Sequence, residues 1–429
     1  MRRASAFLAP LREVAQGVAW LSAASLLVKP VWFVFITVVC ARALGAEGYG
    51  VLNTAIALAT LAFSLTGFGM SMYTVREVAQ DRTRAPRFLT NFTVLRGVLG
   101  VVATALAMGA AVALGYDRTL TMAVLMWCFY TATNGFNVLA HSFFQAFETL
   151  HYQALSLVGE KVLVIAGGAA LLYATGSAVG VLGGLALGMA LASLGTYALC
   201  LARTTRFDRS LLDWSFTGNA LRSMVPFGVA GALGMFFFRV DNVMVEAFQG
   251  AAEAGRYGLG FRVVEALNLL PALVVHATAY PRLSRLSGPA DARDFRRTMG
   301  GVGLFLIAVC VPISTVLYVF ADSIVYWIAP NASLSGAAAV LRVLCWAFVL
   351  TSIRELFHVT LLARGEQGFI ARALAVAVVG NVALNAVLIP RMGGEGAALA
   401  TIASEALLLG AYLVRYVRVR PPGSAGEER

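Results

Sequence analysis

Charged side chains are scarce in this chain of 429 residues. Only 13% of the residues are charged, whereas 59% are hydrophobic, and the mean hydropathy is +0.78. A soluble domain has about 45–50% apolar and about 25% charged residues. The shortage of charge therefore excludes an ordinary soluble enzyme, a disordered chain and a nucleic-acid binder, and it indicates a polytopic membrane protein.

Lysine is nearly absent and cysteine is infrequent. All but two of the 33 basic residues are arginine, the exceptions being Lys29 and Lys161. The five cysteines lie inside apolar segments without paired spacing, so neither a disulfide framework nor a zinc site is indicated. Phosphate-binding loops, nucleophile motifs and metal-ligand spacings are also missing. We therefore expect no enzymatic activity, no metal and no cofactor.

Long apolar segments are abundant. A membrane-spanning helix needs about 20 predominantly apolar residues. Segments of this kind, separated by glycine, proline or charged residues, predict twelve helices. They cover residues 15–40, 50–75, 88–115, 120–145, 152–175, 178–202, 221–247, 257–281, 299–321, 335–362, 368–390 and 394–416.

Arginine is distributed unevenly between alternate loops. With a cytoplasmic N-terminus, the arginine clusters at residues 76–87, 203–222 and 282–297 all lie on the cytoplasmic side. Cytoplasmic loops of membrane proteins carry such an excess of basic residues, so both termini are predicted to be cytoplasmic. The first apolar segment continues for ten residues past Lys29-Pro30 without a small-residue cleavage site, which favours a retained helix over a signal peptide.

The second half of the chain repeats short features of the first half in the same order. Ala46–Gly50 joins the first two predicted helices, and the similar stretch Ala252–Gly258 joins the seventh and eighth. Six helices per half give a parallel repeat related by an axis along the membrane normal. We therefore predict two six-helix lobes around a central cavity, suited to alternating access. Residues 1–202 form the N-terminal lobe, 203–220 a cytoplasmic linker, 221–420 the C-terminal lobe and 421–429 a cytoplasmic tail.

Ionisable residues inside the predicted helices are the strongest functional signal. Each costs at least ~2.5–3.5 kcal/mol at a helix centre, so such residues usually face a cavity or a partner. Cations dominate the inner positions, and Asn242 shares a helix face with Arg239 because the two are three residues apart. The predicted substrate-binding residues are Lys29, Arg239, Arg354, Arg262 and Asn242.

Two carboxylates are candidates for ion coupling. Asp241 points away from Arg239 on the same predicted helix, and we expect it to pair with a basic residue of a neighbouring helix. Glu405 lies alone near the centre of the last predicted helix. Polar cavity walls are expected from four asparagines, Asn134, Asn137, Asn381 and Asn385.

Several motifs resemble those of a known family. The segment Arg42-Ala-Leu-Gly-Ala-Glu-Gly-Tyr-Gly50 resembles the R-x-L-G-x-x-x-Y-G motif of polysaccharide-biosynthesis flippases. Arg76-Glu77 is similar to the family's R-E pair. The stretch Arg239-Val-Asp241, followed by Gly255-Arg-Tyr257 and Pro281-Arg-Leu283, resembles its second-lobe signature. The similarity extends over nearly the whole chain in spacing, and the first motif is the most specific.

The resemblance implies the oligosaccharidyl-lipid flippase branch of the multidrug/oligosaccharidyl-lipid/polysaccharide exporter superfamily. It implies translocation of polyprenyl-diphosphate-linked oligosaccharides from the inner to the outer leaflet of the cell (inner, cytoplasmic) membrane. The implied pathway is cell-surface polysaccharide biosynthesis, including that of lipopolysaccharide. The expected partners are this lipid-linked substrate, membrane lipid and other polysaccharide assembly proteins.

Alternative functions stay open at this point. An ion-coupled multidrug exporter of the same superfamily is one, although its cation-attracting site should be rich in acids and aromatics, whereas cations dominate here. A lipid II flippase is another, although some relatives of that kind have fourteen helices. A membrane-bound polymerase or ligase would need acid–base groups or a large loop, which the sequence lacks. A transporter-like scaffold that does not flip lipid is a further alternative.

Overall fold

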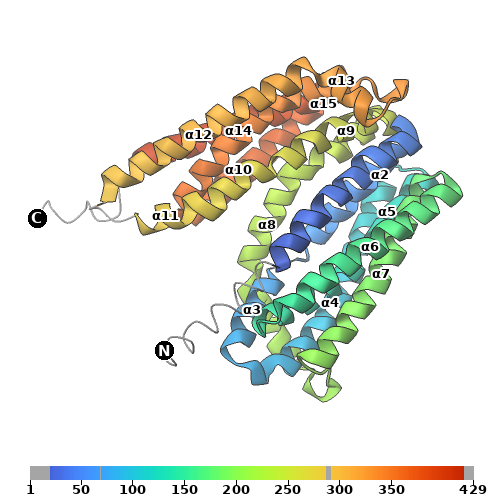
Figure 1. Ribbon diagram of the computed structural model, residues 1–429, viewed down its shortest axis with the longest axis vertical. Helices are drawn as coiled ribbons and strands as arrows, with labels where there is room; N and C mark the ends of the chain where they lie inside the picture. The colour runs from blue at the N-terminus through green and yellow to red at the C-terminus, as the bar shows by residue number, and fades with distance from the viewer. Residues whose placement is uncertain (1–19, 68, 287–290, 420–429) are drawn as a thin grey trace, which may run out of the picture. The chain divides into compact units, whose positions relative to one another are not determined.

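The regular structure is helical throughout the residues that the computed structural model describes, 20–67, 69–286 and 291–419 (Figure 1). By its contacts the chain divides into two compact units. One consists of residues up to Leu44 together with Thr54–Met235. The other consists of Gly45–Asn53 together with the chain from Phe236 onwards.

The first unit contains the opening helices of the chain. A helix that begins at Trp20 passes through a π-helical turn at Val34–Val39 into α2, which spans Cys40–Ser64. Gly45 breaks α2 with a left-handed φ of 65° and a ψ of −169°, a conformation that suits glycine because it lacks a Cβ. The following helices are α3 (Met70–Gln80), α4 (Ala85–Ala113), α5 (Arg118–Ala146), α6 (Leu150–Thr175), α7 (Ala178–Arg203) and the first part of α8 (Trp214–Gln249).

The second unit contains the remainder of α8 and the later helices. α9 (Ala251–Leu267) and α10 (Leu269–Leu273) lead through a π-helical turn at Val274–Ala279 into α11 (Tyr280–Arg285). The chain continues through α12 (Ala292–Val319), α13 (Ala321–Ile328), α14 (Ala337–Ala363) and α15 (Gln367–Arg418). Gly393, with φ 58° and ψ −137°, breaks α15 into two helices, as Gly45 breaks α2. Short 3₁₀ turns lie at Arg82–Arg84, Arg209–Leu211 and Ala332–Leu334.

Eight of the described helical segments are long and apolar enough to cross a membrane. Two of them, Trp20–Ser64 with 45 residues and Gln367–Arg418 with 52, exceed one crossing and are each divided by a glycine break. The helices α5 and α8, of 29 and 36 residues, are not among the eight but are also long enough to cross. With both breaks and these two helices counted, the described residues contain the predicted twelve long helices.

Some predicted boundaries are wrong. The segment 50–75 is not one helix, because α2 ends at Ser64 and α3 begins at Met70 after a turn in which the Thr66 hydroxyl caps the Phe63 carbonyl at 2.9 Å. The span predicted at 257–281 lies within one longer helical segment, Ala251–Arg285, which contains a turn at Asn268 and a π-helical turn after Pro271. The first helix continues to Leu44, and its predicted start at residue 15 lies outside the described residues.

Local capping explains where several helices begin. Asp117 accepts from the Leu120 amide at 2.9 Å at the start of α5, and Ser177 accepts from Gly180 at 3.1 Å at the start of α7. Asp213 accepts from the amides of Ser215 and Phe216 at the start of α8. The Phe216 amide and the Arg87 guanidinium lower the pKa of this exposed carboxyl.

Small residues permit the closest helix contacts inside each unit. In the first unit α6 packs on α7, where a Cβ on Gly184 would lie 2.1 Å from the Gly167 carbonyl oxygen (Figure 1). In the second unit a Cβ on Gly50 would lie 1.7 Å from the carbonyl oxygen of Ala251, and a Cβ on Gly255 would lie 2.0 Å from that of Ala46. The two repeated motifs of the sequence therefore pack backbone to backbone.

The predicted lobe boundaries stay a prediction. The two compact units meet in the chain at Met235/Phe236, inside α8, whereas the predicted linker covers residues 203–220. The units are defined by contacts between residues, and the long helix α8 contributes residues to both of them.

Candidate functional site

Two arginines share one carboxylate in the second unit. Arg239 of α8 donates from Nη2 to Glu265 Oε1 at 2.6 Å, and Arg262 of α9 donates from Nη1 to Glu265 Oε2 at 3.2 Å. Arg262 also donates from Nε to Asn53 Oδ1 at 3.3 Å, and Asn53 donates to the Tyr49 carbonyl at 2.9 Å. The cluster therefore carries one guanidinium in excess of its carboxylate.

Aromatic rings hold Arg239 in place. Its guanidinium carbon lies 5.0 Å from the ring centroid of Phe238 and 5.6 Å from that of Phe261. Such cation–π contacts contribute about 0.5–1 kcal/mol at exposed sites and about 2 kcal/mol or more when desolvated. Arg239 and Glu265 are 26 residues apart in the chain, so short-range spacing in the sequence does not indicate this pair.

Asp241 is buried in a cluster of neutral hydrogen-bond donors. The Asn385 side-chain amide donates to its Oδ1 at 2.6 Å, whereas the hydroxyls of Thr401 and Tyr257 donate to Oδ2 at 2.7 Å and 3.1 Å. No ion pair joins Asp241 to a basic residue in the part of the chain that the structure describes. The prediction of a basic partner is wrong, because Asp241 contacts α15, which presents asparagine and threonine at this depth.

Three of the four asparagines predicted to line a cavity, Asn137, Asn381 and Asn385, are hydrogen-bonded to other buried groups. Asn381 accepts from Asn385 at 3.0 Å beside Asp241, and both are buried. In the first unit Asn137 donates to Glu160 Oε2 at 2.5 Å, and Lys161 pairs with Oε1 of the same carboxylate at 2.5 Å. Asn242 is also buried, with a side-chain amide nitrogen that has no hydrogen-bond partner among the described residues.

Arg354 forms a second arginine–carboxylate cluster with the opposite balance. Its Nε lies 2.6 Å from Glu405 Oε2, and its Nη1 lies 3.3 Å from Glu355 Oε2. Glu355 also contacts His276 Nε2 at 2.9 Å. The description of Glu405 as an isolated carboxylate is therefore wrong. Two carboxylates surround Arg354, so its charge is already matched within the protein.

Two intramembrane cations have no acidic partner among the described residues. Lys29 is exposed on the first helix and forms no ion pair there. Arg96 lies near the middle of α4, where a Cβ on Gly135 of α5 would sit 3.5 Å from Arg96 Cδ, and its Nε has no hydrogen-bond partner. Arg96 is not among the substrate-binding residues predicted from the sequence. Its position about three turns inside the helix that starts at Ala85 could have identified it as a charged residue within a membrane helix.

The described residues contain no group of three histidine, cysteine, aspartate or glutamate side chains that could hold a metal ion. The Asp241 cluster offers oxygen atoms from Asp241, Asn381 and Thr401 within one hydrogen-bonded group. Oxygen donors of this kind suit a hard cation or a proton.

The family model described as "Polysaccharide biosynthesis protein" matches residues 14–287, and the MatE model matches residues 226–387. A relative named probable low-salt glycan biosynthesis flippase Agl15, from Haloferax volcanii, is 26% identical over 221 residues. The match covers 50% of this chain and 46% of the relative, so the chain spans about half the length of this curated relative.

Solved structures of two transporters share the fold. The lipid II flippase MurJ in an inward closed conformation matches with a TM-score of 0.73 and 14% identity, covering 93% of this chain and 87% of that chain. An inward-facing multidrug resistance MATE family transporter of the MOP superfamily matches with a TM-score of 0.70 and 17% identity, covering 90% and 92%. These likenesses and the twelve long helices confirm the predicted all-α, two-lobed membrane fold.

The relatives are named as flippases and transporters, in agreement with the expectation that the chain is not an enzyme. The family model covers well over half of the chain, and the long apolar helices make it a multi-span membrane protein. The motif at Arg42–Gly50, the buried charge clusters and these comparisons lead to one conclusion: the chain belongs to the polysaccharide biosynthesis protein family of membrane proteins.

Proposed function

We propose that this protein is a flippase that moves polyprenyl-diphosphate-linked oligosaccharides from the inner to the outer leaflet of the cell membrane by alternating access between two lobes. Its family and its similarity to a glycan biosynthesis flippase support a role in cell-surface polysaccharide biosynthesis. Lipopolysaccharide is one such product, and other polysaccharide assembly proteins would supply and receive the lipid-linked substrate.

The observation that carries the proposal is the surplus of cations in the membrane region. Arg239 and Arg262 share a single carboxylate, and neither Lys29 nor Arg96 has an acidic partner among the described residues. A diphosphate moved through bare hydrocarbon would lose hydration at a cost on the order of tens of kcal/mol. Guanidinium groups can replace that hydration with paired hydrogen bonds to the phosphate oxygens.

The roles of the remaining site residues follow from their partners. In the second unit Arg239 and Arg262 would contact the diphosphate, and in the first unit Lys29 and Arg96 would act as anion-binding residues. Arg354 would contribute less, because Glu355 and Glu405 already neutralise it. Asn242, buried beside Arg239 with an unpaired amide nitrogen, would donate to a sugar or phosphate oxygen.

Ion coupling is assigned to Asp241 in preference to Glu405. Asp241 has only neutral partners, so a proton or a sodium ion would change its charge balance directly. Glu405 is held by Arg354 at 2.6 Å, and an incoming cation would have to displace that arginine. Binding at Asp241 would connect α8 to α15 and so couple the ion to the arrangement of the helices in this unit.

Two alternative substrates differ from this proposal in chemistry. A lipid II flippase is favoured by the structural match with MurJ, and its substrate would carry the same diphosphate with a different glycan. A multidrug exporter is favoured by the MatE match and the MATE structures. A cationic drug would be repelled by the surplus of cations, which ranks the exporter below either flippase.

Mass spectrometry of lipid extracts from a strain that lacks this protein tests the proposal. We expect a polyprenyl-diphosphate oligosaccharide to accumulate and to disappear on complementation with the wild-type chain but not with Arg239→Gln. Fragment masses distinguish an oligosaccharide repeat unit from lipid II. An unchanged lipid profile in the deletion strain, with increased sensitivity to cationic drugs, would support the exporter and contradict the flippase.

A further inference from the structure

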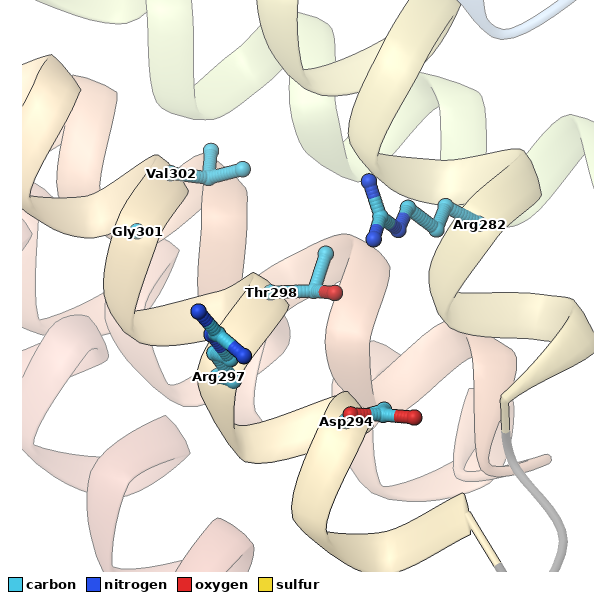
Figure 2. Close-up of a pocket in the computed structure, with 6 residues that line it drawn as sticks. All are labelled: Arg282, Asp294, Arg297, Thr298, Gly301 and Val302. Atoms are coloured by element: carbon cyan, nitrogen blue, oxygen red, sulfur yellow. The ribbon is translucent and has the colours of Figure 1, made fainter.

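A polar cavity lies between α11 and α12 at one end of the second unit. It has a volume of about 430 Å³ and lies at the end of the unit that carries the arginine cluster 282–297. Its lining residues are Arg282 of α11 and Asp294, Arg297, Thr298, Gly301 and Val302 of α12. In Figure 2, Arg282 reaches from α11 toward Thr298 of α12, and Arg297 and Asp294 lie on the same helix beside it.

The cavity has the charge of an anion-binding site. Arg282 and Arg297 form no ion pair with any residue of the described chain, so both guanidinium groups keep their donors available. The Thr298 hydroxyl adds a further donor. Asp294 is the single carboxylate in the lining, so one positive charge remains in excess. This balance suits a phosphodiester, which carries one negative charge, better than a multiply charged phosphate.

The Asp294 carboxylate would help to select the headgroup. An ionised aspartate can only accept hydrogen bonds. A headgroup that combines a phosphodiester with hydroxyl groups would present its phosphate to the two arginines and a hydroxyl to Asp294. A choline headgroup has no hydroxyl or N–H to donate.

The apolar surface of α12 continues directly from the cavity. Residues 294, 298, 301 and 305 recur every three to four positions and so lie on one helix face. Leu304 and Phe305, one turn beyond Gly301, are 70% and 51% exposed. A Cβ built on Gly301 would meet nothing within 4 Å, so the helix surface is open between the cavity and these side chains. Acyl chains attached to a phosphate in the cavity could therefore lie along Leu304 and Phe305.

We propose that this cavity binds the headgroup of an anionic, hydroxylated phospholipid of the phosphatidylglycerol type, with its acyl chains along the exposed face of α12. The arginine distribution predicts that this end of the protein is cytoplasmic. Basic pockets at the cytoplasmic ends of membrane helices are suited to anionic headgroups. The lipid site is separate from the substrate path proposed above and does not depend on it.

Native mass spectrometry of the purified full-length protein in mild detergent tests the site. Phosphatidylglycerol is titrated against phosphatidylcholine and phosphatidylethanolamine of the same acyl composition. We expect phosphatidylglycerol to bind at least about tenfold more tightly, and Arg282→Gln or Arg297→Gln to weaken it by about tenfold, as expected for loss of a charged hydrogen bond. Arg293→Gln and Arg296→Gln are matched controls for Arg297→Gln, because they remove the same charge from the first turns of α12 without lining the cavity.

A second pair of variants tests the cavity without changing charge. Gly301→Leu fills the open space and should abolish the preference for phosphatidylglycerol. Gly300→Leu, which also meets open space but does not line the cavity, should leave it unchanged. Asp294→Asn should retain phosphatidylglycerol binding, because an amide oxygen still accepts from a hydroxyl and the repulsion of the phosphate is removed.

Four outcomes would overturn the proposal. Equal weakening by the Arg296→Gln control would indicate general attraction between charged surfaces. Preferential binding of phosphatidylethanolamine that is lost in Asp294→Asn would assign the cavity to an ammonium headgroup. Displacement of the lipid by millimolar glycerol phosphate or inorganic phosphate would assign it to a soluble anion. Equal binding of all three lipids would leave no specific site. Each readout measures binding, so a failed flippase assay would leave it unaffected.

Discussion

Two arginine–carboxylate clusters in the second unit are built from the same residue types in opposite proportions. In the first, Arg239 and Arg262 share Glu265. In the second, Glu355 and Glu405 share Arg354. The first cluster retains a surplus positive charge that can attract a phosphate, whereas the second is saturated with carboxylates. An arginine inside a membrane helix is therefore a candidate for anion binding only when the nearby arginines outnumber the carboxylates that pair with them.

The largest expected effect comes from removing the arginine of the saturated cluster. Arg354→Leu leaves the buried Glu405 without a counter-charge and Glu355 with only its contact to His276, and breaking a buried ion pair costs about 3–5 kcal/mol. We expect the melting temperature of the purified protein to fall sharply. The double variant Arg354→Leu/Glu405→Leu removes the main pair together and should regain most of the lost stability. A double variant no more stable than the single one would contradict this account of the cluster.

In the cluster of Arg239, Arg262 and Glu265, removal of an arginine should affect transport more than stability. Arg239→Gln leaves Glu265 paired with Arg262, so we expect a loss of stability of only about 1 kcal/mol. Transport of the lipid-linked substrate should fall at least about tenfold, since the lost contact would be charge-assisted. Transport by reconstituted protein and thermal unfolding measure the two effects separately. If Arg239→Gln and Arg354→Leu lose transport and stability in parallel, the two clusters do not differ in function.

The two candidate coupling carboxylates give a third contrast. Asp241→Asn removes the only charge from a cluster of neutral donors and should abolish the dependence of transport on sodium or on the proton gradient. Glu405→Gln keeps the shape of its side chain, and Glu355 still pairs with Arg354, so ion dependence should persist. Transport is measured across a range of sodium concentrations at two pH values. Loss of ion dependence in Glu405→Gln alone would reverse the assignment.

The smallest expected change in stability concerns Arg96. Because this guanidinium has no acidic partner among the described residues, Arg96→Met removes a poorly compensated charge and should leave stability unchanged or raise it slightly. Transport should nevertheless decrease if Arg96 contacts the diphosphate. Normal transport by Arg96→Met would restrict the anion-binding role to Arg239, Arg262 and Lys29.

The sequence predicted the membrane helices well where the signal was local. The last two helices, predicted at 368–390 and 394–416, correspond to the two parts of α15 on either side of Gly393. The prediction failed at residues 50–75, where apolar composition continues through the turn between α2 and α3. Hydrophobicity indicates that a segment prefers lipid. The break after Ser64 depends instead on a few backbone angles and on the hydrogen bond from the Thr66 hydroxyl to the Phe63 carbonyl.

The sequence identifies the charged residues inside the helices but not the contacts that they make. Arg239, Asp241, Arg354 and Glu405 were identifiable because charge is costly at membrane depth. Their partners were not, since Asp241 was expected to meet a cation and instead contacts Asn385, Thr401 and Tyr257. An aspartate carries the same sequence signal whether its neighbour is a guanidinium or an amide.

The sequence by itself determined the long apolar helices, the repeated motifs and the family, because hydrophobic length and short-range spacing are properties of contiguous residues. Only the tertiary structure decided which charges remain unmatched. Arg239 and Glu265 are 26 residues apart, Arg354 and Glu405 are 51 apart, and Asp241 and Asn385 are 144 apart. Such pairs depend on which helix faces pack together, and helix packing is set by the folded arrangement of small and large side chains along whole helices.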